Sequence, residues 1–205
     1  AGCHHPGHTE ILADLTHTES VAMMLVAGDF RVTHVSTHCA LREAIERAKK
    51  KRILEVIRLT HDALKLMGIA HPRLAVAGLN PHAGEGGLFG DEEMTEIAPA
   101  IDAARAEGID VYPRPVPPDT VFYRMSSGHQ FDAVVAMYHD QGHIPTKVLA
   151  FAEGVNVTLG LPIIRTSVDH GTVYGKAGKG TADPTSLKRA IEVAVLMVRG
   201  REERG

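Results

Sequence analysis

Three histidines stand just after three segments that have the composition of buried strands. His38 follows segment 30–37, His82 comes shortly after segment 73–79, and His139 comes shortly after segment 131–137. The run 131–137 is apolar and rich in β-branched residues, which is typical of a buried parallel strand. Because open α/β sheets place their binding sites at the carboxyl ends of strands, we expect the three imidazoles to meet there.

The chemistry of imidazole indicates a metal site. Neutral imidazole is the commonest protein ligand for a borderline metal, and three protein ligands with one open position make a catalytic site. His38, His82 and His139 therefore predict a divalent metal, with zinc as the best match and magnesium, manganese or cobalt as alternatives. His143 is a rival ligand because it follows His139 by one helical turn. Each histidine alone could instead cap a helix or complete a local polar network.

Two cations and an amide follow His139 along the chain, namely Lys147, Asn156 and Arg165. Lysine and arginine supply fixed positive charge for a phosphate or carboxylate, and asparagine adds a neutral donor. Arg165 comes directly after the apolar run 159–164, which argues against simple surface charge. For Lys147 the alternative of a solvated surface charge stays open, since that is the usual place of lysine.

The glycine-rich loop 80–90 resembles a phosphate-binding loop but lacks its defining residues. No Gly-Lys-Ser/Thr ending is present, and the third glycine of the dinucleotide fingerprint is out of register. We interpret the loop as a tight turn that brings His82 to the site.

Composition excludes several classes of protein. The chain has 205 residues, 44% hydrophobic and 23% charged, with a formal net charge of -3, which gives no reason to expect nucleic acid as a partner. No apolar run is long enough to span a bilayer, so no membrane partner is expected. The two cysteines, Cys3 and Cys39, form no disulfide framework, which favours the cytoplasm. Because the chain begins at Ala1, without a methionine, and its first residues form a polar loop, we expect the chain to be a piece of a longer protein.

Strands alternate with helices along the chain. Strands are expected at 21–27, 30–37, 73–79, 109–112, 131–137 and 155–159, the first two joined by a turn at Gly28-Asp29. Helices are expected after Thr9, at 40–50, 53–67, 91–106, from about 119, at 140–152 and at 184–198, with a glycine-rich loop over 169–181. This alternation predicts an α/β fold with a mostly parallel sheet.

Longer motifs resemble one known family, the 4-hydroxythreonine-4-phosphate dehydrogenases of vitamin B6 biosynthesis. The matching stretches run in family order and are Gly7-His-Thr-Glu10, Thr37-His38, Asn80-Pro-His-Ala-Gly-Glu85, Gly90-Asp-Glu-Glu93, Pro118-Asp-Thr120, Tyr138-His-Asp-Gln-Gly142, Gly154-Val-Asn156, Leu161-Pro-Ile-Ile-Arg-Thr-Ser167 and Asp169-His-Gly-Thr172.

The resemblance implies a site and an architecture. It places the metal on His38, His82 and His139, and it places substrate contacts on His8, Thr9, Lys147, Asn156 and Arg165. The loop 170–184 looks like the adenosine-binding loop of isocitrate and isopropylmalate dehydrogenases, with His170, Gly171, Thr172 and Asp183 as cofactor residues for NAD or NADP. The implied fold is three-layer α/β/α, in a homodimer that shares the metal site between subunits. Residues 1–155 would form the central metal-binding and dimerisation domain and 156–205 a remnant of the cofactor-binding domain, with the N-terminal part of the first domain missing.

The resemblance also implies an oxidation. A metal-bound secondary alcohol of a phosphorylated four-carbon hydroxy acid, 4-phosphohydroxy-L-threonine, would pass its hydride to NAD(P), and the β-keto acid would decarboxylate. Lys147 and Asp119 are the candidate catalytic residues. The run Gly142-His-Ile-Pro145 looks more like a sister branch that acts on 4-phospho-D-threonate or erythronate. Two other readings stay open: an inactive truncated metal-binding dimer module, and a metal-dependent hydrolase with Asp119 or Asp140 as base.

Overall fold

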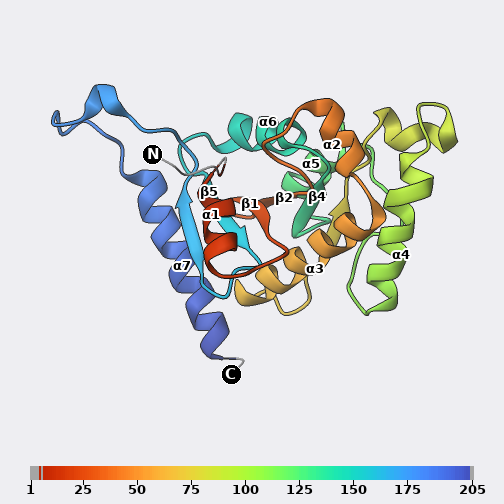
Figure 1. The fold of residues 1–205 in the computed structure, drawn as a ribbon, viewed down its shortest axis with the longest axis horizontal. Helices are drawn as coiled ribbons and strands as arrows, with labels where there is room; N and C mark the ends of the chain where they lie inside the picture. Colours follow the sequence, from red (N-terminus) through yellow and green to blue (C-terminus); the bar gives the residue numbers. More distant parts are fainter. Residues whose placement is uncertain (1–4, 6, 204–205) are drawn as a thin grey trace.

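A computed structural model describes residue 5 and residues 7–203 of the chain (Figure 1). Its elements are α1 (His8–Leu15), β1 (Ala22–Ala27), β2 (Phe30–His34), α2 (Leu41–Arg47), α3 (Lys50–Leu66), β3 (Leu74–Val76), η1 (Pro81–Gly87), η2 (Glu93–Ile97), α4 (Ala98–Ala106), α5 (Val121–Ser126), β4 (Ala133–Ala136), α6 (His139–Ala150), β5 (Val155–Leu159), β6 (Arg165–Val168), η3 (Tyr174–Lys176) and α7 (Thr185–Glu202). Cys3 lies outside the described residues, and Cys39 is a free thiol.

The described strands form one mixed sheet in the order β3-β4-β2-β1-β5-β6. The β3-β4 and β4-β2 pairs are parallel, whereas β2-β1, β1-β5 and β5-β6 are antiparallel. It follows from these pairings that β2, β3, β4 and β5 run in one direction and that β1 and β6 oppose them. The expected α/β class is confirmed, with the parallel pairs at one end of the sheet.

Helices cover both faces of the sheet, which gives the expected three layers. On one face Met24 of β1 and Val135 of β4 share a core with Ile57 of α3, Ile101 of α4 and Met197 of α7. Figure 1 places α7 along one end of the molecule and α4 along the other.

The opposite face has a smaller core and carries the polar residues of interest. Val32 of β2 and Val134 of β4 pack there with Val121 and Met125 of α5. Helix α6 contacts β2, β1 and β4 on this side, and α1 approaches β5. The sheet thus separates an apolar face from a face on which polar side chains gather.

Several expected elements differ from the structure. Segment 109–112 forms only an isolated bridge between Leu74 and Val111, because the chain touches the sheet edge there without running along it. Strand β6 was not expected, since its half-buried sequence Arg-Thr-Ser-Val has no apolar run. Strand β2 ends at His34, so His38 follows it by a short loop.

The predicted domain boundary between residues 155 and 156 falls inside β5. That strand pairs with β1 along its length, from Val26 opposite Val155 to Ala22 opposite Leu159. Both predicted parts therefore share one sheet, and the division into two domains stays a prediction. No helix within the described part of the chain is long and apolar enough to cross a membrane.

Candidate functional site

Two of the three predicted metal ligands lie side by side. His38 lies on the loop after β2, and His139 is the first residue of α6, directly after the extended residue Tyr138. Their ring centroids are 5.8 Å apart, and both rings line a cavity of about 500 Å³. The His139 Nδ1 atom lies 2.6 Å from the Asp140 carboxylate, which leaves Nε2 of His139 as the nitrogen available to a ligand.

Two further histidines extend this pair into the core, and only one of them was foreseen. His143 stacks on His139 with centroids 3.6 Å apart and planes 10° apart, and its Nδ1 is 3.0 Å from the His139 carbonyl oxygen. His34 lies 4.7 Å from the His143 ring, and its Nδ1 is 3.2 Å from the Met23 carbonyl oxygen. Sequence reasoning missed His34, although its place within the apolar alternation of 30–37 was a usable signal of an inward-facing imidazole.

Burial keeps the inner imidazoles neutral. The pKa of His34 is lowered from 6.5 to about 3, first by burial and then by the neighbouring His143. Burial also lowers the pKa of His143, followed by the effect of His139. The Nε2 atom of His34 is buried without a hydrogen-bond partner. Neutral imidazole is the metal-binding form, so this environment favours ligation over cation formation.

His82 lies on an unusual turn, apart from that pair. Residues 82–86 all have positive φ, with 54° at His82, 55° at Ala83 and 44° at Glu85, which is a left-handed turn that L-residues rarely adopt. The His82 side chain is 64% exposed and its nearest polar partner is Glu85, at 3.6 Å. Within the described residues, no group of three or more His, Cys, Asp or Glu side chains is placed to hold a metal.

A buried carboxylate holds that turn in place. Glu93 Oε1 accepts the backbone N–H groups of Leu79 and Asn80, both at 2.7 Å, and Oε2 accepts the Asn80 side-chain amide at 2.9 Å. A Cβ on Gly84 would lie 2.7 Å from Glu93 Oε2, so only glycine fits there. Glu93 belonged to a recognised motif, but its anchoring role was not predicted.

Three of the predicted substrate residues gather on the polar face of the sheet. Arg165 Nη1 donates to Thr158 Oγ1 at 3.1 Å, and Thr9 Oγ1 lies 3.4 Å from the same hydroxyl. Asn156 lies two residues earlier on β5, donates to Met23 Sδ at 3.3 Å, and keeps a buried Oδ1 without a partner. Burial lowers the pKa of Arg165, and no carboxylate of the described residues forms an ion pair with it. A half-buried cation of this kind is suited to bind an anion.

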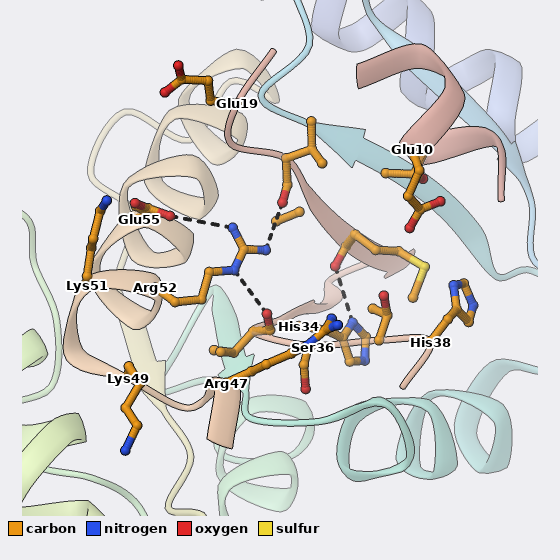
Figure 2. A pocket seen from close by; sticks show the side chains of 16 residues that line it. Glu10, Glu19, His34, Ser36, His38, Arg47, Lys49, Lys51, Arg52 and Glu55 are labelled. Carbon is orange, nitrogen blue, oxygen red and sulfur yellow. Dashed lines mark hydrogen bonds and ion pairs between the residues drawn. The ribbon is translucent and has the colours of Figure 1, made fainter. Parts of the chain in front are cut away.

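One cavity lies beside two of the histidines, His34 and His38. It has a volume of about 580 Å³, and Figure 2 shows the side chains around it, with Glu10, His34, Ser36 and His38 on one side. Thr9 also lines it. At its other end Arg52 is held by the carbonyl oxygens of Val21 and Val35, at 2.8 and 3.1 Å, so this cation serves the fold.

Among the predicted site residues, only Thr9 and His38 line that cavity, so Lys147, His8 and Asp119 lie outside it. Lys147 pairs with Asp169 at 2.8 Å, and His8 is exposed at the start of α1. Asp119 lines a different, largely apolar cavity of about 640 Å³ between α5 and α6. Its predicted catalytic role therefore gains no support from contact with His38 or His139.

The predicted cofactor loop is exposed over residues 170–184. His170 Nδ1 lies 3.0 Å from the Gly171 carbonyl oxygen, and Thr172 is exposed. Asp183 Oδ1 accepts the backbone N–H and the hydroxyl of Thr185 at 2.9 and 2.6 Å, and these bonds lower the pKa of Asp183. Asp183 thus orders the start of α7, a role that was not predicted.

Comparison with known proteins gives a consistent set of relatives. Residues 1–194 match the model of a family described as "Pyridoxal phosphate biosynthetic protein PdxA". The chain is 53% identical over 197 residues to a D-threonate 4-phosphate dehydrogenase of Pectobacterium atrosepticum, covering 96% of this chain and 60% of that protein. It is 55% identical over 197 residues to a 4-hydroxythreonine-4-phosphate dehydrogenase of Beijerinckia indica, and the match covers 96% of this chain and 58% of that protein.

A solved structure agrees with these relatives. The crystal structure of a 4-hydroxythreonine-4-phosphate dehydrogenase from Klebsiella pneumoniae superposes with a TM-score of 0.84 at 50% identity, covering 95% of this chain and 60% of that one. The chain therefore spans about 60% of the length of the relatives that it matches.

Proposed function

The chain belongs to the PdxA family of pyridoxal phosphate biosynthetic proteins, and from this premise we propose that it takes part in an NAD(P)-dependent, metal-assisted oxidation of a phosphorylated hydroxy acid. Its relatives are named for two such substrates, 4-hydroxythreonine 4-phosphate and D-threonate 4-phosphate. We propose the first as the main substrate and the second, with erythronate 4-phosphate, as the alternative. The relatives' full-length activity is assigned to this shorter chain as a proposal.

The observation that carries the proposal is the cavity with Thr9 and His38 on its wall. Thr9 also contacts Thr158, which accepts a hydrogen bond from Arg165, and these three residues are the proposed anion-binding group. Asn156, on the same strand as Thr158, has a buried carbonyl oxygen without a hydrogen-bond partner. His38, on the same cavity wall as Thr9, lies beside His139. A substrate with a phosphate or carboxylate at one end and a hydroxyl in the middle needs this kind of arrangement, because the anion fixes where the hydroxyl lies.

The residues present fit a divalent metal. His38 and His139 offer neighbouring imidazoles, and Asp140 at Nδ1 of His139 orients that ring as carboxylate partners orient metal-bound histidines. When bound, the metal would act as a Lewis acid toward the substrate hydroxyl. Zinc suits imidazole ligands best, with magnesium, manganese or cobalt as alternatives.

We propose that the third imidazole comes from a second copy of the chain. His82 is exposed on a rigid left-handed turn and is absent from any ligand group of its own described chain. In a two-fold dimer each such turn can reach the other subunit's site. The site would then consist of His38, His139 and the partner's His82, which keeps the expected ligand set and the expected homodimer.

NAD or NADP would accept the hydride, and the exposed loop 170–184 is the proposed place for its adenosine part. The β-keto acid product would lose CO2. We place the reaction in the cytoplasm, in keeping with the free thiol of Cys39.

Metal analysis together with reduced-cofactor formation tests the proposal. His38→Ala, His82→Ala and His139→Ala should each remove most of the metal, whereas His143→Ala and the exposed control His71→Ala should retain it. Metal-dependent absorbance of NADH or NADPH with either four-carbon phosphate would support the oxidation. Unchanged metal in His139→Ala would contradict the ligand set, and phosphate release without reduced cofactor would favour a hydrolase.

A further inference from the structure

The buried side chain of Gln141 joins two segments that lead to proposed metal ligands. Gln141 is the third residue of α6, two positions after His139, and it is only 8% exposed. Its Oε1 atom accepts the backbone N–H of Met137 at 2.7 Å, and its Nε2 atom donates to the Gly78 carbonyl oxygen at 2.8 Å. The amide therefore connects two stretches of backbone that lie far apart in the sequence.

The first contact fixes the start of α6. Met137 comes directly after β4, and the extended residue Tyr138 separates it from His139. Because Gln141 lies in the first turn of the helix and binds back to Met137, a side-chain hydrogen bond closes the turn that begins with His139. His139 is thereby held close to the end of β4.

The second contact fixes the start of the left-handed turn that carries His82. Gly78 comes shortly after β3, which pairs in parallel with β4, so the two contacts lie at the carboxyl ends of neighbouring strands. A Cβ on Gly78 would lie 2.8 Å from Ala83 Cα and 3.2 Å from Glu93 Oε1, which shows that the turn folds back onto Gly78. Ala83 is next to His82, so the position of Gly78 determines where His82 lies.

We propose that Gln141 is a positioning residue that holds both metal-binding elements of one chain in place, His139 through Met137 and His82 through Gly78. The inference rests on the proposed function, in which His139 belongs to one metal centre of the dimer and His82 of the same chain belongs to the other. One amide then serves both centres. Glutamine suits this task because its amide is a donor and an acceptor at once and carries no charge.

Amide hydrogen exchange of the metal-free protein tests the two contacts without any ligand. Gln141→Met keeps the length of the side chain but removes both polar atoms. The N–H groups of Met137, Leu79 and Asn80 should then exchange about tenfold faster, because the buried hydrogen bonds that hold the two segments are lost. Gln130→Met is the matched control, since Gln130 is exposed and its partner is Arg124, and its exchange at these positions should equal that of the wild type.

A second variant keeps the test decisive if the methionine variant does not fold. Gln141→Asn retains the amide on a side chain that is one methylene shorter, so it cannot hold both contacts, and exchange should become faster in at least one of the two segments. Exchange at the wild-type rate in both segments would overturn the inference.

Subunit mixing shows which centre each contact serves. In a mixed dimer of a His82→Ala chain and a His38→Ala chain, the one intact centre takes His139 from the first chain and His82 from the second. Gln141→Met in the first chain therefore acts on this centre through His139, and in the second chain it acts through His82. Each placement should weaken the binding of Co²⁺ about tenfold, measured by the visible absorption of the bound ion.

A control for stability separates positioning from a general structural role. Gly200→Ala forces a Cβ against the Leu66 carbonyl oxygen, between α7 and α3, so it should lower Tm and leave the affinity for Co²⁺ unchanged. An equal loss of affinity in Gly200→Ala would overturn the inference, and so would a loss confined to one placement of Gln141→Met. If the mixed dimer with Gln141 intact bound no Co²⁺, the shared site of the proposed function would fail, while the exchange rates would still decide whether Gln141 holds the two segments.

Discussion

Gly142→Ala should destabilise the protein, although alanine normally stabilises a helix. Gly142 is buried in α6, where the side chain of β2 residue Val32 and the ring of His34 press against it. An added Cβ would lie 2.7 Å from Val32 Cγ1, 3.1 Å from His34 Cδ2 and inside contact distance of His34 Nε2. Carbon atoms normally approach to about 3.5–4.0 Å, so the helix or the strand has to move.

The sign of the change in stability follows from two opposing contributions to the free energy of unfolding. Alanine gains about 1 kcal/mol over glycine in helix propensity. Overpacking a core costs about 1–3 kcal/mol, and the upper end applies because Val32 and His34 are both almost completely buried on a central strand. The net loss is therefore about 2 kcal/mol, which corresponds to a fall in Tm of about 4–8 °C for a domain of this size.

Thermal unfolding followed by circular dichroism measures this change. Gly175→Ala is the matched control, since nothing lies within 4 Å of a Cβ added there, and its Tm should stay near the wild-type value. A Tm above that of the wild type would refute the close packing on which the histidine cluster depends.

Three further predictions follow from the site. Arg165→Lys should weaken inorganic phosphate about tenfold in calorimetry, because the planar fork is lost while the charge stays, and equal affinities would make Arg165 structural. Burial lowers the pKa of His34 from 6.5 to about 3, so on acidification the unfolded chain protonates this imidazole at a higher pH than the folded protein does. The contribution of His34 to the free energy of unfolding is therefore complete above pH 6.5. It falls between pH 6.5 and pH 3 by up to ~1.4 kcal/mol per pH unit. Denaturant titrations should show a shallower pH dependence in His34→Gln, and an identical slope would contradict the assignment. Glu93→Ala should lower metal affinity about tenfold because it frees the turn that carries His82, whereas Glu92→Ala should have a small effect. Metal titration of both variants measures the two affinities, and an equal loss of affinity in both would contradict this role of Glu93.

Much of the architecture follows from sequence pattern. The apolar run 131–137 predicts the buried strand β4, and the turn at Gly28, with φ of 59°, joins β1 to β2 as expected. Strand β6 escaped this reasoning because an edge strand with half-buried polar residues lacks the apolar alternation on which a prediction depends. Segment 109–112 has strand composition, but only Val111 reaches the sheet.

The site was less predictable, for reasons of geometry. The closeness of His38 and His139 could be predicted, because they follow β2 and β4, which lie side by side in the sheet. The left-handed turn around His82 cannot be read from sequence, because Ala83 and Glu85 carry no preference for positive φ. The bridge between Lys147 and Asp169 joins residues 22 positions apart, and spacing alone gives no sign of it.

We propose that the metal site is shared between two copies of the chain, and this arrangement can be tested by mixing subunits. A His82→Ala protein is exchanged with a His38→Ala protein, and the purified mixed dimer is analysed for metal. One of its two sites should then hold His38, His139 and the partner's His82 intact, so metal binding should recover to about half of the wild-type value. A mixed dimer of His38→Ala and His139→Ala should bind no metal at either site, because those two ligands belong to one chain. Metal binding in that second dimer, or no metal binding in the first after verified exchange, would show that the two chains do not divide the ligands in this way.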